Sequence, residues 1–236
     1  MHRKAIETKT DAVRSMFDSI ALRYDFLNHL LSFGIDFYWR RKAINLLRQY
    51  QPKRILDIAT GTGDLAIAAL KLKPVEVIGV DIAEEMLRLG RDKLRRKGLD
   101  SVIELQVGNA EQLQFPTSSF DAVTVAFGVR NFENLERGLS EIHRVLKPHG
   151  VALVLEFSRP RTFPVKQVYG FYLDRIVPIL GGAISHNRSA YEYLPQTVAE
   201  FPDGKSFLKY LERVGFSEAQ CYCLTFGTVS IYLGIK

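Results

Sequence analysis

The fold of this chain is decided by one stretch, Leu56-Asp57-Ile58-Ala59-Thr60-Gly61-Thr62-Gly63-Asp64-Leu65-Ala66. It completes a short apolar run over residues 54–58 and leads into apolar residues at helical spacing over 65–72. The two glycines of the turn let the backbone bend sharply and approach a ligand that a Cβ atom would exclude. A buried strand, a glycine turn and a helix in this order predict a nucleotide-binding unit of an α/β fold.

Beyond this turn, strand-like and helix-like segments alternate as far as residue 157. Such alternation predicts a mostly parallel sheet with helices on both faces, and it places ligands at the carboxyl ends of the strands. The predicted strands are 54–58, 75–80, 102–107, 120–126 and 151–157, and the predicted helices are 65–72, 84–97 and 135–146.

The segments on either side of this core are richer in helix. Before it, apolar residues at helical spacing predict helices over 10–22 and 36–50. After residue 158 the pattern changes, because aromatic residues become frequent and two closely spaced strands read as an antiparallel pair at the sheet edge. The predicted helices there are 163–180, 189–201 and 205–214, and the strands are 218–224 and 228–233.

Composition places the chain among globular proteins, with 47% hydrophobic and 25% charged residues in a length of 236. No stretch reads as a spanning helix or as a secretory signal, so we expect a cytoplasmic protein. Cys221 and Cys223 are too close in sequence to form a usual disulfide, and no second cluster completes a metal site. We therefore expect no bound metal and a reducing compartment.

The chain has a net charge of +6, and six of its basic residues crowd the helix predicted over 84–97. A basic run of this kind can contact nucleic acid or anionic lipid. No recognisable RNA-binding module accompanies it, so we favour a solvated helix face over nucleic acid. A peripheral, salt-sensitive contact with the inner face of a membrane stays open. The basic residues are Arg88, Arg91, Lys93, Arg95, Arg96 and Lys97.

Polar side chains follow the first three strands of the core. Asp57 lies near the end of the first strand, where a carboxylate suits a cationic aminoacyl sulfonium group. Asp81 follows the second strand at the spacing expected of a ribose ligand. Asn109 and the backbone N–H of Ala110 can together hydrogen-bond the edge of an adenine. These positions indicate S-adenosylmethionine as the ligand.

A nicotinamide dinucleotide is the competing ligand. The stretch Gly61 to Ala66 also satisfies the dinucleotide pattern G-x-G-x-x-G/A, and Asp81 lies about twenty residues beyond it. Two features argue against this ligand, since Asp57 would repel a pyrophosphate and no second domain exists to hold a hydride acceptor. A nicotinamide-binding protein therefore remains the alternative, and whether the pure chain retains S-adenosylmethionine or NAD would separate the two.

The successive motifs also resemble those of class I methyltransferases. Two longer stretches are similar to the ubiquinone/menaquinone biosynthesis C-methyltransferases, namely Tyr24-Asp25-Phe26-Leu27-Asn28-His29-Leu30-Leu31-Ser32 and Arg144-Val145-Leu146-Lys147-Pro148-His149-Gly150. The resemblance extends through Phe127-Gly128-Val129-Arg130-Asn131 and covers nearly the whole chain. Asp36 departs from it, because this family usually has histidine there.

The resemblance implies a Rossmann-like class I methyltransferase, with a mostly parallel seven-stranded sheet and an antiparallel edge pair. It implies S-adenosyl-L-methionine as cofactor and C-methylation of a prenylated, demethylated quinol, most of all demethylmenaquinol. We expect a single domain, 1–236, made of an N-terminal helical cap (1–50), a cofactor-binding core (51–158), an acceptor-pocket insertion (159–202) and a C-terminal helix and strand pair (203–236). The expected cofactor-binding residues are Asp57, Gly61, Thr62, Gly63, Asp81, Asn109 and Ala110, with Thr62 at the methionine end.

The catalytic candidates are Arg130, Asn131 and Tyr24. Arg130 and Asn131 follow the fourth strand, where ligands of α/β sheets lie, and a guanidinium there could stabilise a phenolate formed from the quinol. Tyr24 fits a packed aromatic residue equally well. Methylation of RNA or of another small molecule remains an alternative. The sequence leaves open whether the ring is a naphthoquinol or a benzoquinol, the tail length, the general base and the oligomeric state.

Overall fold

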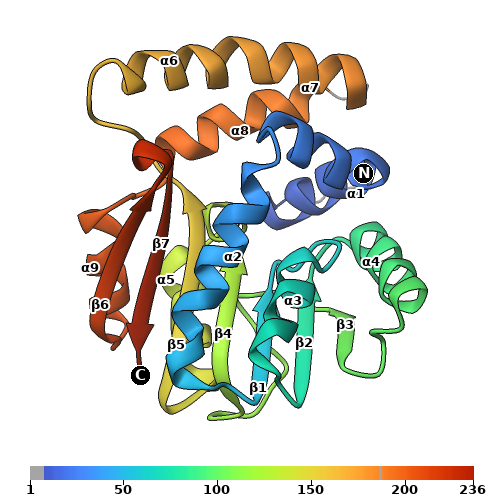
Figure 1. Ribbon diagram of the computed structural model, residues 1–236, viewed down its shortest axis with the longest axis vertical. Helices are drawn as coiled ribbons and strands as arrows, with labels where there is room; N and C mark the ends of the chain where they lie inside the picture. Colours follow the sequence, from blue (N-terminus) through green and yellow to red (C-terminus); the bar gives the residue numbers. More distant parts are fainter. Residues whose placement is uncertain (1–7, 186–187) are drawn as a thin grey trace, which may run out of the picture.

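The computed structural model describes residues 8–185 and 188–236, which form a central sheet covered by helices on both faces (Figure 1). The sheet has seven strands in the order β3-β2-β1-β4-β5-β7-β6. Neighbours from β3 to β5 are parallel, whereas β7 is antiparallel to both β5 and β6. The predicted fold class and edge pair are thus confirmed. The strands are β1 (Arg54–Ile58), β2 (Glu76–Asp81), β3 (Ile103–Val107), β4 (Phe120–Ala126), β5 (Leu146–Phe157), β6 (Ser217–Leu224) and β7 (Val229–Ile235).

The central strands form where the sequence is apolar on both faces. In β1 every residue from Ile55 to Ile58 is buried, as expected of a parallel strand covered by helices on both sides. The start of β5 was predicted wrongly, because the helix before it ends at Val145 and the strand begins at Leu146 rather than at residue 151. A shift of register between Phe120 and Ala122 accommodates the extra residues around Pro148.

Helix ends follow local capping chemistry where that chemistry is present. The helix α4 has the predicted bounds, and it ends at Gly98, which adopts the left-handed conformation with φ 65°. The remaining helices of the core and the C-terminal region differ from prediction by a few residues. The helices are α1 (Lys9–Leu31), α2 (Ile35–Leu47), α3 (Asp64–Ala69), α4 (Glu84–Lys97), α5 (Leu135–Val145), α6 (Val165–Phe171), α7 (Val177–Ser185), α8 (Arg188–Glu200) and α9 (Lys205–Arg213).

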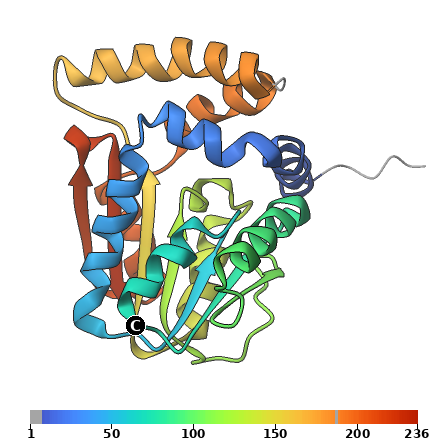
Figure 2. The same ribbon diagram turned by 45° about the vertical axis from the view of Figure 1, so that its right-hand side comes forward.

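A layer of helices covers the carboxyl ends of the parallel strands, as Figures 1 and 2 show from two directions. It consists of α1 together with α6, α7 and α8. The predicted helix over 163–180 is α6 and α7 joined by a π-helical segment of five residues, Tyr172–Ile176. Residues 1–7 of the predicted cap and 186–187 of the predicted insertion lie outside the described residues. Among the helices of the described ranges, none is long and apolar enough to cross a membrane.

Candidate functional site

A cavity of about 680 Å³ lies at the carboxyl ends of β1 to β4, closed from above by α1. It forms there because the sheet order reverses direction beside β1, where the loops after β1 and β4 diverge. Gly128 permits the loop after β4 to approach, since a Cβ there would lie 2.4 Å from the Cβ of Ala59. The lining includes Thr10, Val13, Phe17, Tyr24, Ile58, Ala59, Gly61, Asp81, Ile82, Met86, Gly108, Asn109, Ala110, Glu111, Ala126, Phe127, Gly128, Asn131 and Phe132.

The glycine turn and Asp81 are fixed to each other at one wall of this cavity. The N–H of Gly61 donates to Oδ2 of Asp81 at 2.8 Å, and the N–H of Ala83 donates to Oδ1 at 2.9 Å. Gly61 and Gly63 adopt positive φ angles of 57° and 85°, which side chains rarely tolerate. Burial raises the pKa of Asp81, and the backbone donors oppose that rise. Because each carboxylate oxygen can accept a second hydrogen bond, Asp81 retains acceptor capacity toward the cavity.

Asn109 and Ala110 form the opposite wall. Oδ1 of Asn109 accepts a hydrogen bond from the N–H of Glu111 at 2.8 Å, which holds the side chain in the loop after β3. The side-chain oxygen is thus already engaged with Glu111, although sequence reasoning assigned it to a ligand. Both residues nevertheless line the cavity, as the spacing predicted.

A smaller cavity of about 390 Å³ continues from the glycine turn and is lined by Asp25, Asp57, Thr62 and Asp64. Asp57 is buried, with its two oxygens accepting from the hydroxyls of Thr60 and Thr124 at 2.6 Å each. Burial raises the pKa of Asp57 to about 6, and the two hydroxyl donors oppose the rise. The predicted carboxylate is therefore present at this wall, held by hydroxyls on both oxygens.

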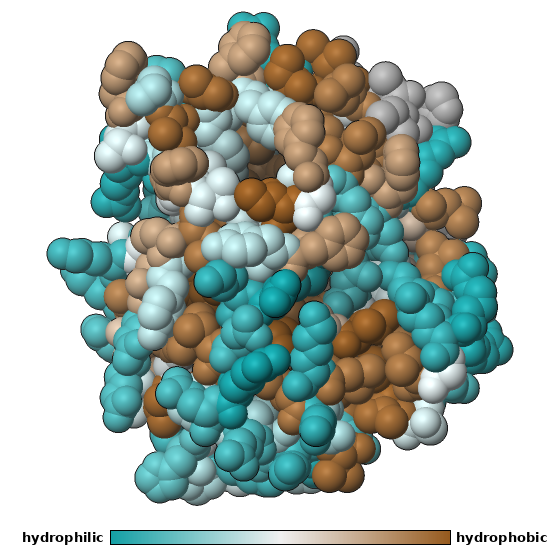
Figure 3. Space-filling model, viewed as in Figure 1, coloured by the Kyte–Doolittle hydropathy of each residue, from teal (hydrophilic) through white to brown (hydrophobic). Residues whose placement is uncertain are grey.

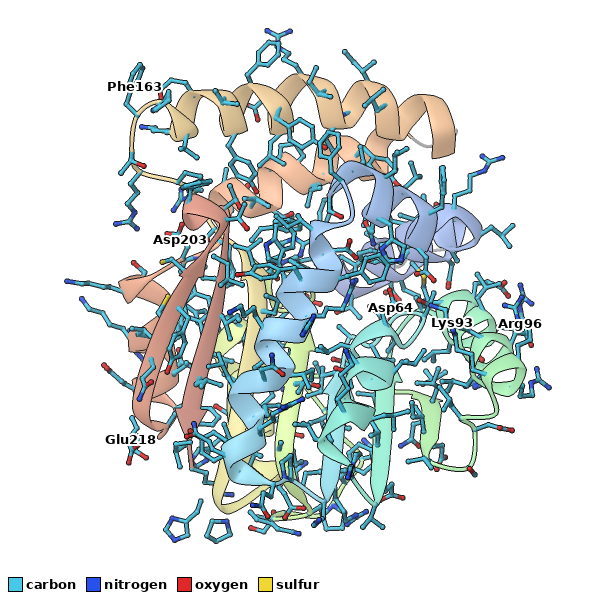
Figure 4. The ribbon with its side chains drawn as sticks, viewed as in Figure 1. Asp64, Lys93, Arg96, Phe163, Asp203 and Glu218 are labelled. Carbon is cyan, nitrogen blue, oxygen red and sulfur yellow. The ribbon has the colours of Figure 1, made fainter. Side chains whose placement is uncertain are left out.

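Thr62 belongs to a polar network beneath the turn. Its hydroxyl donates to Oδ1 of Asp25 at 2.6 Å and accepts from Nζ of Lys93 at 2.8 Å. The same ammonium group lies 2.9 Å from Oδ1 of Asp64, and Figure 4 shows Lys93 and Asp64 reaching toward each other from α4 and α3. Lys93 was expected in an exposed basic run, whereas its side chain points inward and is 18% exposed.

Arg40 is a residue that sequence reasoning missed. Arg40 lines the small cavity and also a third, larger cavity, which is described next. It is ion-paired with buried Asp36 and lies 3.6 Å from Oδ2 of Asp64. Oδ2 of Asp36 also contacts Nδ1 of His29 at 2.7 Å. Among the described residues that line the small cavity, Arg40 is the one cation, beside three aspartates. No pattern in the sequence around Arg40 indicates this position.

The largest of these cavities, about 960 Å³, lies between α1, α2 and the helical layer above them. Its walls are mostly apolar and aromatic, which suits a flat ring with an apolar tail. Phe17, Tyr24 and Phe127 line this cavity and also the one at the strand ends, so the two cavities adjoin. The lining includes Met16, Ile20, Asn28, Leu31, Trp39, Arg130, Phe157, Tyr169, Tyr172, Leu173, Val177, Tyr191, Tyr193 and Leu194.

Arg130 lines this aromatic cavity and forms an ion pair with the buried carboxylate of Glu156. Its Nη1 donates to Oε1 of Glu156 at 2.8 Å and also to the carbonyl of Phe127, and its side chain is 7% exposed. Burial raises the pKa of Glu156, which the guanidinium opposes. Glu156 was not expected to have a role, although a glutamate inside an apolar strand is a signal that could have revealed one.

Asn131, the neighbour of Arg130, faces the cavity at the strand ends rather than the aromatic one. From the sequence we expected both residues to act at one site. In the structure, Asn131 lines the cavity at the strand ends and Arg130 lines the aromatic cavity. Tyr24 lies at the junction, where burial raises the pKa of its hydroxyl and Arg130 lowers it.

Several buried polar atoms around these cavities have no protein partner within the described ranges. They are Nε of Arg130, Oδ1 of Asn131 and the hydroxyls of Tyr191 and Tyr193. Each belongs to a residue that lines one of the two adjoining cavities. Because buried polar groups are otherwise almost always hydrogen-bonded, these atoms are suited to polar groups of bound ligands.

Four of the six basic residues of helix α4 are paired with carboxylates. Arg88 pairs with Glu85 at 2.9 Å, and Arg91 pairs with Glu84 at 3.0 Å. Arg95 pairs with Asp92. These exposed pairs support the interpretation of a solvated helix face.

Comparison with known proteins gives matches over nearly the full chain. A family model described as the ubiE/COQ5 methyltransferase family matches residues 4–236. A demethylmenaquinone methyltransferase of Bacteroides fragilis is 48% identical, covering 97% of this chain and 94% of that protein. A ubiquinone/menaquinone biosynthesis C-methyltransferase UbiE of Geobacter sulfurreducens is 45% identical, covering 97% and 90%.

Solved structures share the fold at low sequence identity. Phosphoethanolamine N-methyltransferase 2 of Haemonchus contortus, in complex with S-adenosyl-L-methionine, matches with a TM-score of 0.68 at 16% identity, over 100% of this chain and 61% of that one. A SAM-dependent methyltransferase of Thermotoga maritima matches with a TM-score of 0.65 at 19% identity, over 94% and 99%. These likenesses confirm the predicted architecture.

Proposed function

Because this chain belongs to the ubiE/COQ5 methyltransferase family, we propose that it transfers a methyl group from S-adenosyl-L-methionine to a ring carbon of a demethylated quinol. The acceptor is demethylmenaquinol, and the product is menaquinol. Relatives at 43–48% identity that carry the name demethylmenaquinone methyltransferase support this acceptor. The predicted enzyme class is confirmed by the family match, and with it the choice of S-adenosylmethionine over a dinucleotide.

One observation carries this proposal, namely that a cavity at the strand ends adjoins an aromatic cavity through Tyr24 and Phe127. A methyl donor and a flat acceptor have to meet within about 3–3.5 Å for direct transfer, and adjoining cavities allow this. The unpartnered atoms of Arg130, Tyr191 and Tyr193 supply hydrogen-bonding groups for a quinol in an otherwise apolar space.

The residues at the strand ends fit the proposed cofactor. Asp81 would accept from the ribose hydroxyls, and Asn109 with Ala110 would hold the adenine. Gly61 and Gly63 allow the backbone to approach, while Thr62 lines the small cavity and the Asp57 carboxylate beside it suits an ammonium group. Arg40, the cation at that wall, suits a carboxylate. When bound, the cofactor supplies an electrophilic methyl group.

The chain's own contribution to the reaction is to hold the quinol and to stabilise its phenolate. Removing a proton from a phenol of pKa about 10 costs about 4 kcal/mol at pH 7. The Arg130 guanidinium is held by Glu156, and its unpartnered Nε is a donor suited to this task. The Tyr24 hydroxyl, whose pKa is raised by burial, can donate to the quinol oxygen. The surrounding aromatic side chains exclude water.

We further propose a division of labour along the chain. Of the segments predicted from the sequence, 1–50 would supply a helical cap, 51–158 the cofactor site, 159–202 much of the acceptor pocket, and 203–236 the remaining strands of the sheet. A polyprenyl quinol resides in lipid, so we also propose a cytoplasmic protein in peripheral contact with a membrane. The pairing of cations on α4 gives no support to an RNA acceptor.

The proposed function is tested with demethylmenaquinol and S-adenosylmethionine labelled on its methyl group, under anaerobic conditions. Label should appear in menaquinone only when a reductant keeps the ring in the quinol form, because only the quinol has a hydroxyl whose deprotonation enriches the ring carbon. Equal rates with and without reductant would contradict this mechanism.

A further inference from the structure

An apolar surface lies on the outer side of the helical layer that covers the aromatic cavity. We call it the roof face, and its exposed fractions are 66% for Val168, 64% for Phe171 and 65% for Ile179. Two further side chains, Phe33 and Phe163, are exposed by more than four-fifths. Figure 3 shows brown and tan side chains gathered over this end of the molecule, around a hollow. The roof face thus consists of Phe33, Phe163, Val168, Phe171 and Ile179.

Three of these residues lie along one run of helix rather than at scattered positions. Val168, Phe171 and Ile179 recur at helical spacing along α6, the π-helical segment and α7. The ring of Phe33, at the corner between α1 and α2, lies 6.2 Å from the ring of Tyr172. Phe163 is in the loop before α6, where Figure 4 shows it at the outer edge of the layer.

The same helices are apolar on their inner side. Tyr169, Leu173 and Val177 line the aromatic cavity from α6 to α7. A helix that is apolar on both sides is expected to be covered on both, and within the described residues nothing covers its outer side. Contiguous apolar surface of this kind marks a contact with another protein or with a membrane.

Charge decides which of these partners fits. Residues 159–180 carry four basic residues, Arg159, Arg161, Lys166 and Arg175, against one acidic residue, Asp174. Arg159 and Arg161 share Asp203, while Lys166 and Arg175 are exposed beside the roof face. A second copy of the chain would bring the same cations against each other in a two-fold interface, whereas anionic lipid would neutralise them.

We propose that the roof face docks on the surface of an anionic lipid bilayer, with its aromatic side chains inserted among the lipid headgroups. This inference rests on the proposed function, since a prenylated quinol would then reach the aromatic cavity from the lipid phase. The contact combines apolar insertion with attraction to Lys166 and Arg175, so salt weakens it without abolishing it. From the sequence, the basic helix α4 was the candidate for a membrane contact that salt releases. We now propose the roof face for that contact instead.

The test is sedimentation of the full chain with vesicles of phosphatidylglycerol and phosphatidylcholine. The double variant Val168→Ser, Phe171→Ser should lower the vesicle partition coefficient about tenfold for each side chain removed. Val75→Ser is the matched control, because Val75 is an equally exposed apolar residue in the loop before β2, at the opposite end of the sheet. Phe171→Leu keeps an apolar side chain and should retain binding.

Turnover separates this inference from the proposed function. The double variant should methylate a short-tailed demethylmenaquinol in solution at the wild-type rate and lose rate with a long-tailed quinol embedded in vesicles. If no form of the enzyme methylates either quinol, the proposed function fails while vesicle binding still decides the surface. Unchanged binding of the double variant, or an equal loss with Val75→Ser, would overturn the inference. So would a wild-type dimer that the double variant dissociates in analytical ultracentrifugation.

Discussion

Replacing Arg130 by alanine should change both the stability of the protein and the rate of methyl transfer. The ion pair between Arg130 Nη1 and Glu156 Oε1 is 2.8 Å long, and the two side chains are 7% and 0% exposed. Removing one partner of a buried pair costs about 3–5 kcal/mol, because the other charge is left uncompensated. Burial already raises the pKa of Glu156, so uptake of a proton by this carboxyl relieves part of the cost.

The effect on rate has a separate origin. Arg130 lines the acceptor cavity, its Nε is a buried donor without a protein partner among the described residues, and we expect this donor to stabilise a developing phenolate. Loss of one such donor typically lowers kcat by about 10²–10³. Arg130→Ala should therefore lower kcat by this factor. Its dissociation constant for S-adenosylmethionine should change less than about threefold, because Arg130 does not line the cofactor cavity.

The double variant Arg130→Met, Glu156→Gln separates the two effects, because it removes both charges and largely keeps the volume. Replacing a buried ion pair as a whole is often neutral or stabilising, so the free energy of unfolding in urea should return close to the wild-type value. The single-turnover rate of the saturated double variant should stay about 10²–10³ below wild type. A rate within about threefold of wild type, roughly 0.65 kcal/mol, would refute a catalytic role for Arg130.

Three further predictions concern the cofactor side. Asp81→Asn should weaken S-adenosylmethionine binding about 10- to 100-fold in calorimetry, because a charge-assisted hydrogen bond is lost. Unchanged affinity in a folded variant would show that Asp81 does not bind the ribose. Arg40→Gln should weaken binding of S-adenosylmethionine but not of its decarboxylated analogue, and an equal loss for both would contradict a carboxylate contact. Asp57 has a folded-state pKa of about 6, above its ordinary value, so its stabilising effect is complete below pH about 4 and is lost as the pH rises through 6. Relative to Asp57→Asn, the unliganded wild-type protein should thus lose about 3 kcal/mol of unfolding free energy between pH 4 and 7 in urea titrations, and parallel pH profiles would exclude this.

The sequence predicted the central sheet well because parallel strands are buried on both faces and therefore read as uninterrupted apolar runs. It predicted the end of α1 wrongly, at Leu22 instead of Leu31. The exposed side chains of Leu22, Phe26 and Leu30 break the amphipathic pattern on which that prediction depended. Exposed apolar residues of this kind are explained only by the surroundings of the folded chain.

The sequence predicted those residues of the candidate site that directly follow a strand. Asp81 and Asn109 follow strands whose carboxyl ends meet at one edge of the sheet, so their position follows from the fold class. Arg40 was missed because its role comes from α2 crossing above the turn after β1, which no local pattern encodes. The occupied oxygens of Asp57 were missed for a similar reason, since Thr124 reaches it from β4.

The lining of the cavities has an evolutionary consequence. Every residue found to line the cofactor cavity precedes residue 133, and among these cavities only the acceptor cavity receives side chains from beyond Phe157. Substitutions in the segment 159–202 can therefore reshape what is methylated without touching what donates the methyl group. Selection for a different ring or a longer tail would act on a short, contiguous piece of the gene. Exchanging that segment between relatives is then a practical route to enzymes with new acceptors.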